Sequence, residues 1–339
     1  MMAFTFRELF LMTVVFTLVF IGLLDLTELK ENRVKETKRE PQHIHNFNTR
    51  ESWPLKSITE NENEPTPTKT EPFDCSKKVL GGTDYTIIYN VMPKTGSRTF
   101  TTLSNQLTLR NGIGKHKEGR SPVILTPKSQ TLRQNSSLLK SFYQESSKDA
   151  VLIRGHNVFV LPWESNFIFL NTIREPIPWM ISLYYFARNG DSKIAMGTTV
   201  DDTSFDECVA RNLSYCVPKF DQYLKYFCGD SPLCRTHEAL SISKSNFESY
   251  LVVGLTEEFR SFIQLIEILL PDIYEGILAD YDQNVEQLHD KTRTKAKQGP
   301  LDETVRNLKE RRDVQIMYEF YNFVKRKFHR LHRCVVGEE

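Results

Sequence analysis

A lysine-bearing turn follows a strongly apolar segment of the chain. Residues 86–91 (TIIYNV) are apolar and β-branched and have the length of a strand. The turn over residues 93–99 reads PKTGSRT, and a helical pattern then continues to Leu107. Backbone N–H groups of such a turn and the following helix N-terminus can bind a phosphate, and Lys94 would add a positive charge. The lysine precedes the glycine, so this is not a Walker A loop, and spacing alone leaves a chance turn open.

A second set of polar residues follows another apolar segment. Residues 167–172 (FIFLNT) predict a buried strand that ends just before Arg174. Residues 178–185 predict a helix, and Ser182 lies on it. Because α/β sheets bind ligands at the carboxyl ends of their strands, Arg174 and the Ser182 hydroxyl could bind a second phosphate. An arginine–carboxylate ion pair and a surface serine are the alternative.

A candidate proton acceptor lies between these two segments. Residues 151–158 (VLIRGHNV) predict a short strand that delivers Arg154 and His156 at its end. A neutral imidazole can take a proton from a hydroxyl near neutral pH. A single histidine is more often structural, so the residue types alone leave both roles open.

The elements that position these residues form one domain behind an unusual N-terminus. Residues 9–24 are uncharged and would span about 24 Å as a helix. No small-residue cleavage pattern follows them, which favours an uncleaved signal anchor over a cleaved signal peptide or a buried core helix. We therefore expect a cytosolic stub and transmembrane anchor over residues 1–26, a flexible, polar stem over 27–82 and a catalytic domain over 83–339.

Four of the six cysteines are close together in the sequence. Cys208 and Cys216 are eight residues apart, and Cys228 and Cys234 are six apart, without a C-x-x-C zinc spacing. In an oxidising lumen this pattern predicts two short-loop disulfides, whereas in the cytosol four buried thiols would be expected. The pairing of the remaining two cysteines is left open.

Composition and glycosylation signals support the same compartment. With 44 Lys and Arg against 43 Asp and Glu, the chain is not a generally basic nucleic-acid binder. Its 40% of hydrophobic residues predict a globular protein. Asn135 and Asn212 each begin an N-x-[ST] sequon, which is typical of lumenal proteins but is also common by chance.

Seven segments in order carry a family resemblance: IIYNVMPKTGSRTF, IRGHNV, FLNTIREPIPWMISLYYFARNGD, SFDECVARNLSYC, YFCGDSPLC, YLVVGLTEEF and EFYNFVKRKF. Together they resemble the glycosaminoglycan uronosyl 2-O-sulfotransferases, a family that includes the heparan sulfate and the uronyl 2-O-sulfotransferases. The resemblance covers residues 84–335. It implies an α/β fold similar to P-loop kinases, with a parallel sheet flanked by helices that binds 3′-phosphoadenosine-5′-phosphosulfate (PAPS).

The resemblance also implies roles for matching positions. His156 falls on the family's catalytic base, and the disulfide pairs fall on Cys208–Cys216 and Cys228–Cys234. The 3′-phosphate would be bound by Arg174 and Ser182. A late basic loop, with Thr292 and Lys295 as the best matches, would close over the nucleotide. The 5′-phosphosulfate loop would comprise Lys94, Thr95, Gly96, Ser97, Arg98 and Thr99, with Lys94 also stabilising the leaving group. No metal is required.

At two positions the sequence differs from members of this family in ways that concern binding of the acceptor. Arg154 stands where the heparan sulfate enzyme has a second histidine, and the uronyl-type enzyme resembles this chain in having arginine there. Val91 stands where the family usually has arginine. Five basic residues are candidates for binding acceptor sulfates and carboxylates: Arg154, Lys115, His116, Lys117 and Arg120.

The sequence therefore predicts transfer of a sulfuryl group from PAPS to the 2-hydroxyl of a uronic acid in dermatan, chondroitin or heparan sulfate. The predicted location is the Golgi membrane, in single-pass type II orientation with a lumenal catalytic domain, and the resemblance allows a homotrimer. Neither metal nor nucleic acid is expected as a partner. A non-catalytic glycan-binding relative and, with less support, a nucleotide kinase remain the alternatives.

Overall fold

The computed structural model describes residues 79–112, 121–147, 150–189, 203–292 and 297–337, all within one compact unit that spans residues 71–339. Side chains of residues 121–125, 150, 189 and 289–292 are not among those described. The expected anchor over residues 9–24 and nearly all of the expected stem lie outside these ranges. Among the described helices, none is long and apolar enough to cross a membrane.

Five parallel strands form the central sheet, in the order β2-β3-β1-β4-β5. The strands are β1 (Thr86–Tyr89), β2 (Ser121–Leu125), β3 (Ala150–Arg154), β4 (Phe167–Ile173) and β5 (Tyr250–Leu255). Every residue of β1 and β4 is buried. Apolar runs of this kind are typical of parallel strands that are covered on both faces, and the expected α/β class is confirmed.

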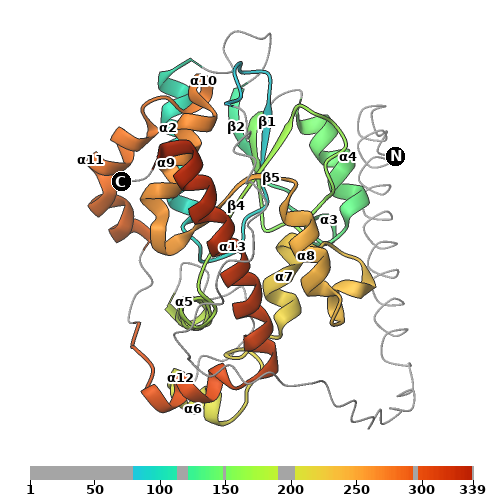
Figure 1. Cartoon of the computed structure of the whole chain (residues 1–339), viewed down its shortest axis with the longest axis vertical. Helices are drawn as coiled ribbons and strands as arrows, with labels where there is room; N and C mark the ends of the chain where they lie inside the picture. The colour runs from blue at the N-terminus through green and yellow to red at the C-terminus, as the bar shows by residue number, and fades with distance from the viewer. Residues whose placement is uncertain (1–78, 113–120, 148–149, 190–202, 293–296, 338–339) are drawn as a thin grey trace, which may run out of the picture. The chain divides into compact units, whose positions relative to one another are not determined.

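Helices cover the sheet on both sides (Figure 1). Figure 1 shows α2, α9, α10 and α11 on one side and α3, α4, α7 and α8 on the other. The bounds are α2 (Ser97–Arg110), α3 (Gln130–Arg133), α4 (Ser136–Ser146), α5 (Pro176–Asn189), α6 (Phe205–Ala210), α7 (Phe220–Cys228), η1 (Pro232–Arg235), α8 (Ala239–Phe247), η2 (Thr256–Glu258), α9 (Phe259–Leu269), α10 (Pro271–Tyr274), α11 (Ile277–Thr292), α12 (Asp302–Lys309) and α13 (Arg312–Val336).

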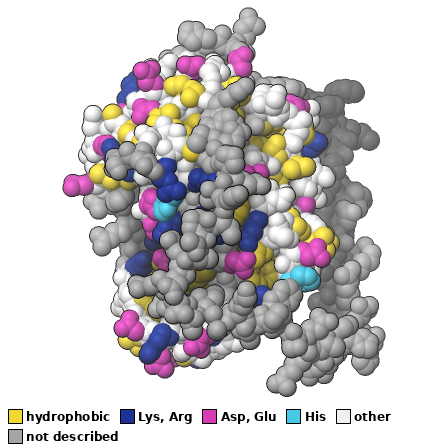
Figure 2. Space-filling model, viewed as in Figure 1, with side chains coloured by type: hydrophobic (Ala, Val, Ile, Leu, Met, Phe, Trp, Pro, Cys, Tyr) yellow, Lys and Arg dark blue, Asp and Glu magenta, His cyan; other side chains and the backbone are white. Residues whose placement is uncertain are grey.

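The long helix α13 links distant parts of the domain. It packs against α5, α7, α8, α9 and β5. Its buried residues recur at helical spacing, for example Met317, Phe320, Val324, Phe328 and Leu331. The face that α13 crosses carries Lys and Arg side chains beside a histidine, interspersed with acidic side chains (Figure 2).

Strand order creates a binding position beside β1. The chain moves from β1 to β2 and β3 on one side and then crosses to β4 and β5 on the other. Tyr89 at the end of β1 is in register with Arg154 in β3 and with Leu170 in β4. Parallel α/β sheets bind ligands where the strand order reverses, at the carboxyl ends of the strands. The loops after β1, β3 and β4 meet there.

Both predicted disulfides are confirmed: Cys208 pairs with Cys216, and Cys228 pairs with Cys234. Cys334 is also disulfide-bonded, while Cys75 lies outside the described residues.

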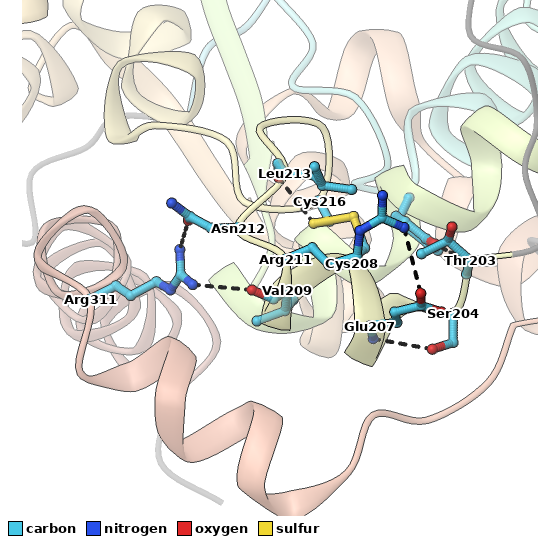
Figure 3. The surroundings of a disulfide bond; sticks show 11 residues. Thr203, Ser204, Glu207, Cys208, Val209, Arg211, Asn212, Leu213, Cys216 and Arg311 are labelled. Carbon is cyan, nitrogen blue, oxygen red and sulfur yellow. Dashed lines mark hydrogen bonds and ion pairs between the residues drawn. A yellow bond between two sulfur atoms is a disulfide. The ribbon is translucent and has the colours of Figure 1, made fainter.

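The Cys208–Cys216 loop is tied to the segment before α13 by Arg311 (Figure 3). This arginine donates from Nη1 to Asn212 Oδ1 at 2.6 Å and from Nη2 to the Val209 carbonyl at 3.3 Å. The first disulfide therefore closes the loop that Arg311 contacts.

The two sequon asparagines lie at exposed positions. Asn135 is the N-cap of α4 and accepts from the Leu138 N–H at 2.9 Å. Asn212 adopts a left-handed backbone conformation, with φ of 55°, in the first disulfide loop. Both asparagines are therefore at the surface of the described domain.

Candidate functional site

The turn after β1, which was predicted to bind a phosphate, has an unusual backbone conformation. Lys94 has φ of 66° and Gly96 has φ of 82°, so the backbone reverses sharply before α2 begins at Ser97. A Cβ atom on Gly96 would lie 2.7 Å from the Phe259 ring. Glycine is therefore required both by the backbone conformation and by the close approach of this ring. The turn presents its backbone N–H groups together with the N-terminus of α2.

Thr95 holds the shape of this loop from inside. Its hydroxyl donates to the Met92 carbonyl at 2.7 Å and lies 2.9 Å from Thr172 Oγ1, which in turn lies 2.8 Å from Tyr89 Oη. The side chain is fully buried. The backbone N–H of Thr95 can serve a ligand, while its hydroxyl is engaged in the loop.

The rest of the predicted loop differs in exposure. Arg98 is exposed, whereas Ser97 and Thr99 are 8% and 4% exposed. Lys94 lies with its ammonium 4.0 Å from the centre of the Phe186 ring, and the Arg98 guanidinium lies 5.7 Å from the same ring. This cation–π contact gives Lys94 a defined position. The sequence offered no signal for Phe186, since an aromatic residue on a helix usually belongs to the core.

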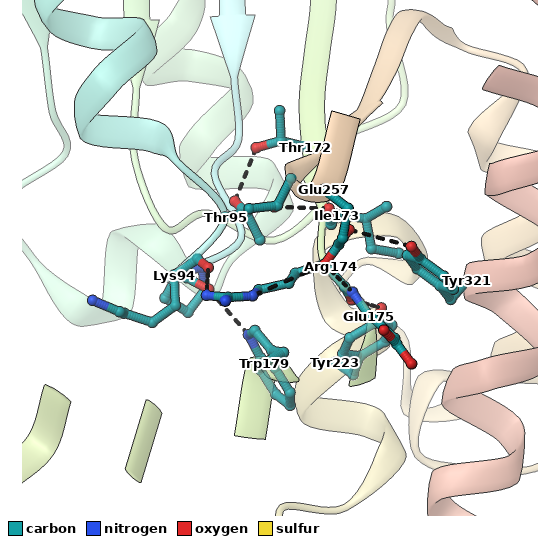
Figure 4. A network of polar contacts seen from close by, with 12 residues as sticks. Lys94, Thr95, Thr172, Ile173, Arg174, Glu175, Trp179, Tyr223, Glu257 and Tyr321 are labelled. Carbon is teal, nitrogen blue, oxygen red and sulfur yellow. Dashed lines mark hydrogen bonds and ion pairs between the residues drawn. The ribbon is translucent and has the colours of Figure 1, made fainter. Parts of the chain in front are cut away.

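Arg174 meets the phosphate loop directly. It follows β4, and its Nη1 donates to the Lys94 carbonyl at 3.2 Å. In Figure 4 the Arg174 side chain points toward Lys94. On the next helix, Trp179 Nε1 donates to the Pro93 carbonyl at 3.0 Å, and the Tyr223 hydroxyl donates to the Arg174 carbonyl. Two elements that are far apart in sequence are thereby fixed together.

Ser182 and the late basic segment were also predicted to bind the nucleotide. Ser182 lies on α5 with its side chain 2% exposed. Thr292 is the last residue of α11, with its side chain outside the described set, and Lys295 lies outside the described residues.

Lys297 is a basic residue that the sequence reasoning missed. Partial burial and the neighbouring charge of Arg174 both lower the pKa of Lys297. Because the charge of Arg174 acts on Lys297, Lys297 is a further candidate for binding an anion at this site. The run of Lys and Thr before it signalled a basic segment but could not indicate which of its residues interacts with Arg174.

His156 is bonded to the chain at the start of the phosphate loop. Its Nδ1 lies 2.9 Å from the carbonyl oxygen of Val91. A carbonyl oxygen only accepts hydrogen bonds, so Nδ1 carries the proton and Nε2 keeps its lone pair. The imidazole remains exposed, while the adjacent Asn157 is buried and donates to Tyr143 Oη at 3.0 Å. The arrangement anchors the histidine backbone and leaves Nε2 as the basic atom.

Positive charge surrounds this histidine. Desolvation by the surrounding protein lowers the pKa of His156, and Arg154, Arg133 and Lys225 lower it further, while the hydrogen bond to Val91 opposes them. Each of these three cations favours the uncharged imidazole, which is the form that a general base needs.

Lys115, His116, Lys117 and Arg120 were acceptor candidates, and all four lie outside the described residues. Arg154 is half-buried at the end of β3, and burial lowers its pKa. Of the five residues predicted to bind the acceptor, Arg154 is the one that the structure describes. Its positive charge lowers the pKa of His156.

Comparison with known proteins gives several relatives. The chain is 31% identical over 261 residues to a heparan sulfate 2-O-sulfotransferase of Caenorhabditis elegans, a match that covers 71% of this chain and 78% of that protein. Heparan sulfate 2-O-sulfotransferase 1 of Xenopus laevis is 30% identical, and that of Homo sapiens is 29% identical, each over 271 residues. Both of these matches cover 76% of this chain and 74% of the relative.

No family model matches the sequence. The relatives nevertheless cover most of the chain at about 30% identity, and the loop, arginine and histidine that the resemblance implied lie at one edge of a parallel sheet. The chain belongs to the glycosaminoglycan uronosyl 2-O-sulfotransferase family.

Proposed function

We propose that this protein transfers a sulfuryl group from PAPS to the 2-hydroxyl of a uronic acid in a glycosaminoglycan. The observation that carries the proposal is the position of His156, whose Nδ1 is bonded to Val91 three residues before Lys94. The proposed proton acceptor and the proposed PAPS-binding loop therefore lie side by side at the carboxyl end of β1. The named relatives support glycosaminoglycan 2-O-sulfation as the reaction.

The nucleotide would be bound at two places. The backbone N–H groups over residues 94–99 suit the 5′-phosphosulfate. Arg174, with Ser182 and the basic segment that contains Lys297, suits the 3′-phosphate, because a guanidinium can bind phosphate through two parallel hydrogen bonds. PAPS, when bound, supplies the sulfuryl group and leaves as 3′-phosphoadenosine-5′-phosphate (PAP).

His156 would act as the general base. Its Nε2 takes the proton of the acceptor hydroxyl as the hydroxyl oxygen attacks sulfur. The Val91 carbonyl holds the ring in the tautomer that makes this possible. The lowered pKa of His156 favours the neutral imidazole, the form that accepts a proton.

Lys94 would stabilise the leaving group. As the bond between sulfur and the bridging oxygen breaks, negative charge develops on the 5′-phosphate. The ammonium group rests 4.0 Å from the centre of the Phe186 ring, beside the loop whose N–H groups face the same phosphate. Positioning and electrostatic stabilisation are the contributions that this loop can make.

Arg154 would bind a carboxylate or sulfate of the acceptor next to the target hydroxyl. It stands at the carboxyl end of β3, two residues before the base. We extend the proposal to a lumenal catalytic domain in the Golgi, which fits the three disulfide-bonded segments and the exposed sequons.

A binding and activity assay would distinguish the proposal from the alternatives. Titration with PAP and with ATP, combined with transfer of labelled sulfate from PAPS to a mixture of desulfated glycosaminoglycans, gives three patterns. Preference for PAP with transfer supports the proposal. PAP binding without transfer would indicate a non-catalytic relative, and preference for ATP would indicate a kinase.

A further inference from the structure

A short turn after β5 is fixed at each of its three residues. In η2 the Thr256 hydroxyl donates to the Ile173 carbonyl at 2.9 Å. Glu258 pairs with His329 Nε2 at 2.8 Å. Between them lies Glu257, whose carboxylate faces Arg174. A carboxylate on such a turn has little freedom to move away.

Two donors hold the Glu257 carboxylate itself. The Glu175 N–H donates to Oε1 at 3.1 Å, and the Tyr321 hydroxyl of α13 donates to Oε2 at 3.2 Å. Oε1 also lies 4.0 Å from Arg174 Nε (Figure 4). Moving the carboxylate away would leave a backbone N–H and a tyrosine hydroxyl without their acceptor, which is costly at a partly buried position.

The carboxylate compensates the charge of Arg174 without occupying its binding edge. The two side chains are 23% and 33% exposed, and Nε has no hydrogen-bond partner among the described residues. Burial lowers the pKa of Arg174, whereas Glu257 and Glu175 raise it. The Nη1 group instead points to the Lys94 carbonyl. A phosphate can therefore bind at the Nη edge while Glu257 stays in place.

We infer that Glu257 is a resident counter-ion of Arg174 that opposes the 3′-phosphate of the nucleotide and so limits the affinity for the product PAP. This inference rests on the proposed function. The Glu257 carboxylate lies within ion-pair distance of Arg174 Nε. A phosphate bound to the Nη groups of the same arginine would therefore lie only a few ångströms beyond that distance from the carboxylate. Like charges at such separations repel appreciably in a partly buried site. The same contact compensates the charge of Arg174 when no nucleotide is present.

The test uses the isosteric variant Glu257→Gln in the full-length protein. Glutamine keeps the shape and one acceptor oxygen, and it removes the negative charge. Calorimetric titration should show that the Kd for PAP falls about three- to tenfold. The Kd for 5′-AMP, which lacks the 3′-phosphate, should stay within about twofold, since the repelled group is missing.

Glu258→Gln is the matched control. It is the same substitution on the next residue, where the carboxylate pairs with His329, away from Arg174. It should leave the affinities for PAP and 5′-AMP unchanged. Thermal melting of all variants checks that each one is folded.

The outcomes separate this inference from the function on which it rests. If the wild-type protein binds PAP no better than 5′-AMP, the proposed nucleotide site is wrong. If it prefers PAP and Arg174→Ala removes that preference, but Glu257→Gln weakens PAP binding or leaves it unchanged, the counter-ion inference alone is overturned. An equal gain in affinity from Glu258→Gln would also overturn it.

Discussion

The imidazole of His156 and the carbonyl of Val91 are joined by a hydrogen bond of 2.9 Å. Val91 begins the segment that leads to Lys94, and its carbonyl fixes which imidazole nitrogen carries the proton. The position of the base and the path of the phosphate loop are thus set by one peptide group. This relationship links acceptor activation to donor binding in the proposed reaction.

Replacement of the base should separate chemistry from binding. His156→Ala removes the proton acceptor, so kcat should fall by about 10²- to 10⁴-fold. The Kd for PAP should be unchanged, because the substitution alters none of the groups proposed to bind the nucleotide. Turnover per PAP-binding site is the measurement, with His237→Ala, at an exposed histidine, as the control. Loss of stability with full activity in the folded fraction would show that His156 is structural.

The charge of Arg154 should set the acid limb of the pH profile. Arg154 is one of the positive groups that lower the pKa of His156. In the wild type the rate should rise with pH through a pKa below the ordinary histidine value of 6.5, because only neutral imidazole accepts a proton. Arg154→Met removes a positive charge, so this pKa should rise and the limb should move to higher pH.

The measurement for this prediction is kcat/KM for PAPS against pH at saturating acceptor. Arg235→Met, at an exposed arginine of η1, is the matched control and should leave the limb in place. A limb that stays in place or moves to lower pH in Arg154→Met would contradict the electrostatic coupling.

Loss of Arg174 should remove recognition of the 3′-phosphate. Arg174→Ala should weaken PAP binding by about 2–3 kcal/mol, or roughly 30- to 150-fold, since a charge-assisted contact disappears. Binding of 5′-AMP should weaken much less, because this nucleotide lacks the 3′-phosphate and is affected only through the lost hydrogen bond from Arg174 to the Lys94 carbonyl. Arg260→Ala, which breaks an exposed ion pair with Asp282, should have no effect on either nucleotide. Equal losses for PAP and 5′-AMP would place the 3′-phosphate elsewhere.

The first disulfide should contribute to stability. Cys208→Ser opens the loop that Arg311 ties to the segment before α13, and the free energy of unfolding should fall by about 2–4 kcal/mol. Denaturant unfolding followed by tryptophan fluorescence measures the loss. A reductant should lower the stability of the wild type further than that of this variant, since the variant has already lost one bridge. An unchanged unfolding midpoint would argue against a stabilising role.

Local patterns were sufficient to predict three of the five described strands and the sharp turn after the first of them. The buried run over 167–172 became β4, which extends to Ile173, and the run over 86–91 contains β1. The turn with Lys94 and Gly96 was identified because its chemistry lies in consecutive residues. The short cysteine spacings predicted both disulfides for the same reason.

The contacts that complete the site could not be predicted from local patterns. Trp179 reaches the Pro93 carbonyl, and Glu257 reaches Arg174, over sequence separations of 86 and 83 residues. Such contacts depend on the order of the strands, which nothing in the sequence of each strand specifies. Phe186 under Lys94 is a further case, because an aromatic residue on an amphipathic helix gives no sign that it faces a ligand site.

The proposed reaction is sulfation of a uronic acid at its 2-hydroxyl. The most direct measurement is transfer from labelled PAPS to desulfated heparin, dermatan and chondroitin in parallel, followed by disaccharide analysis of the products. We expect label in 2-O-sulfated uronic acid from at least one polymer, and its loss with His156→Ala. Label only on hexosamine positions, or no transfer by a protein that binds PAP, would contradict the proposed reaction.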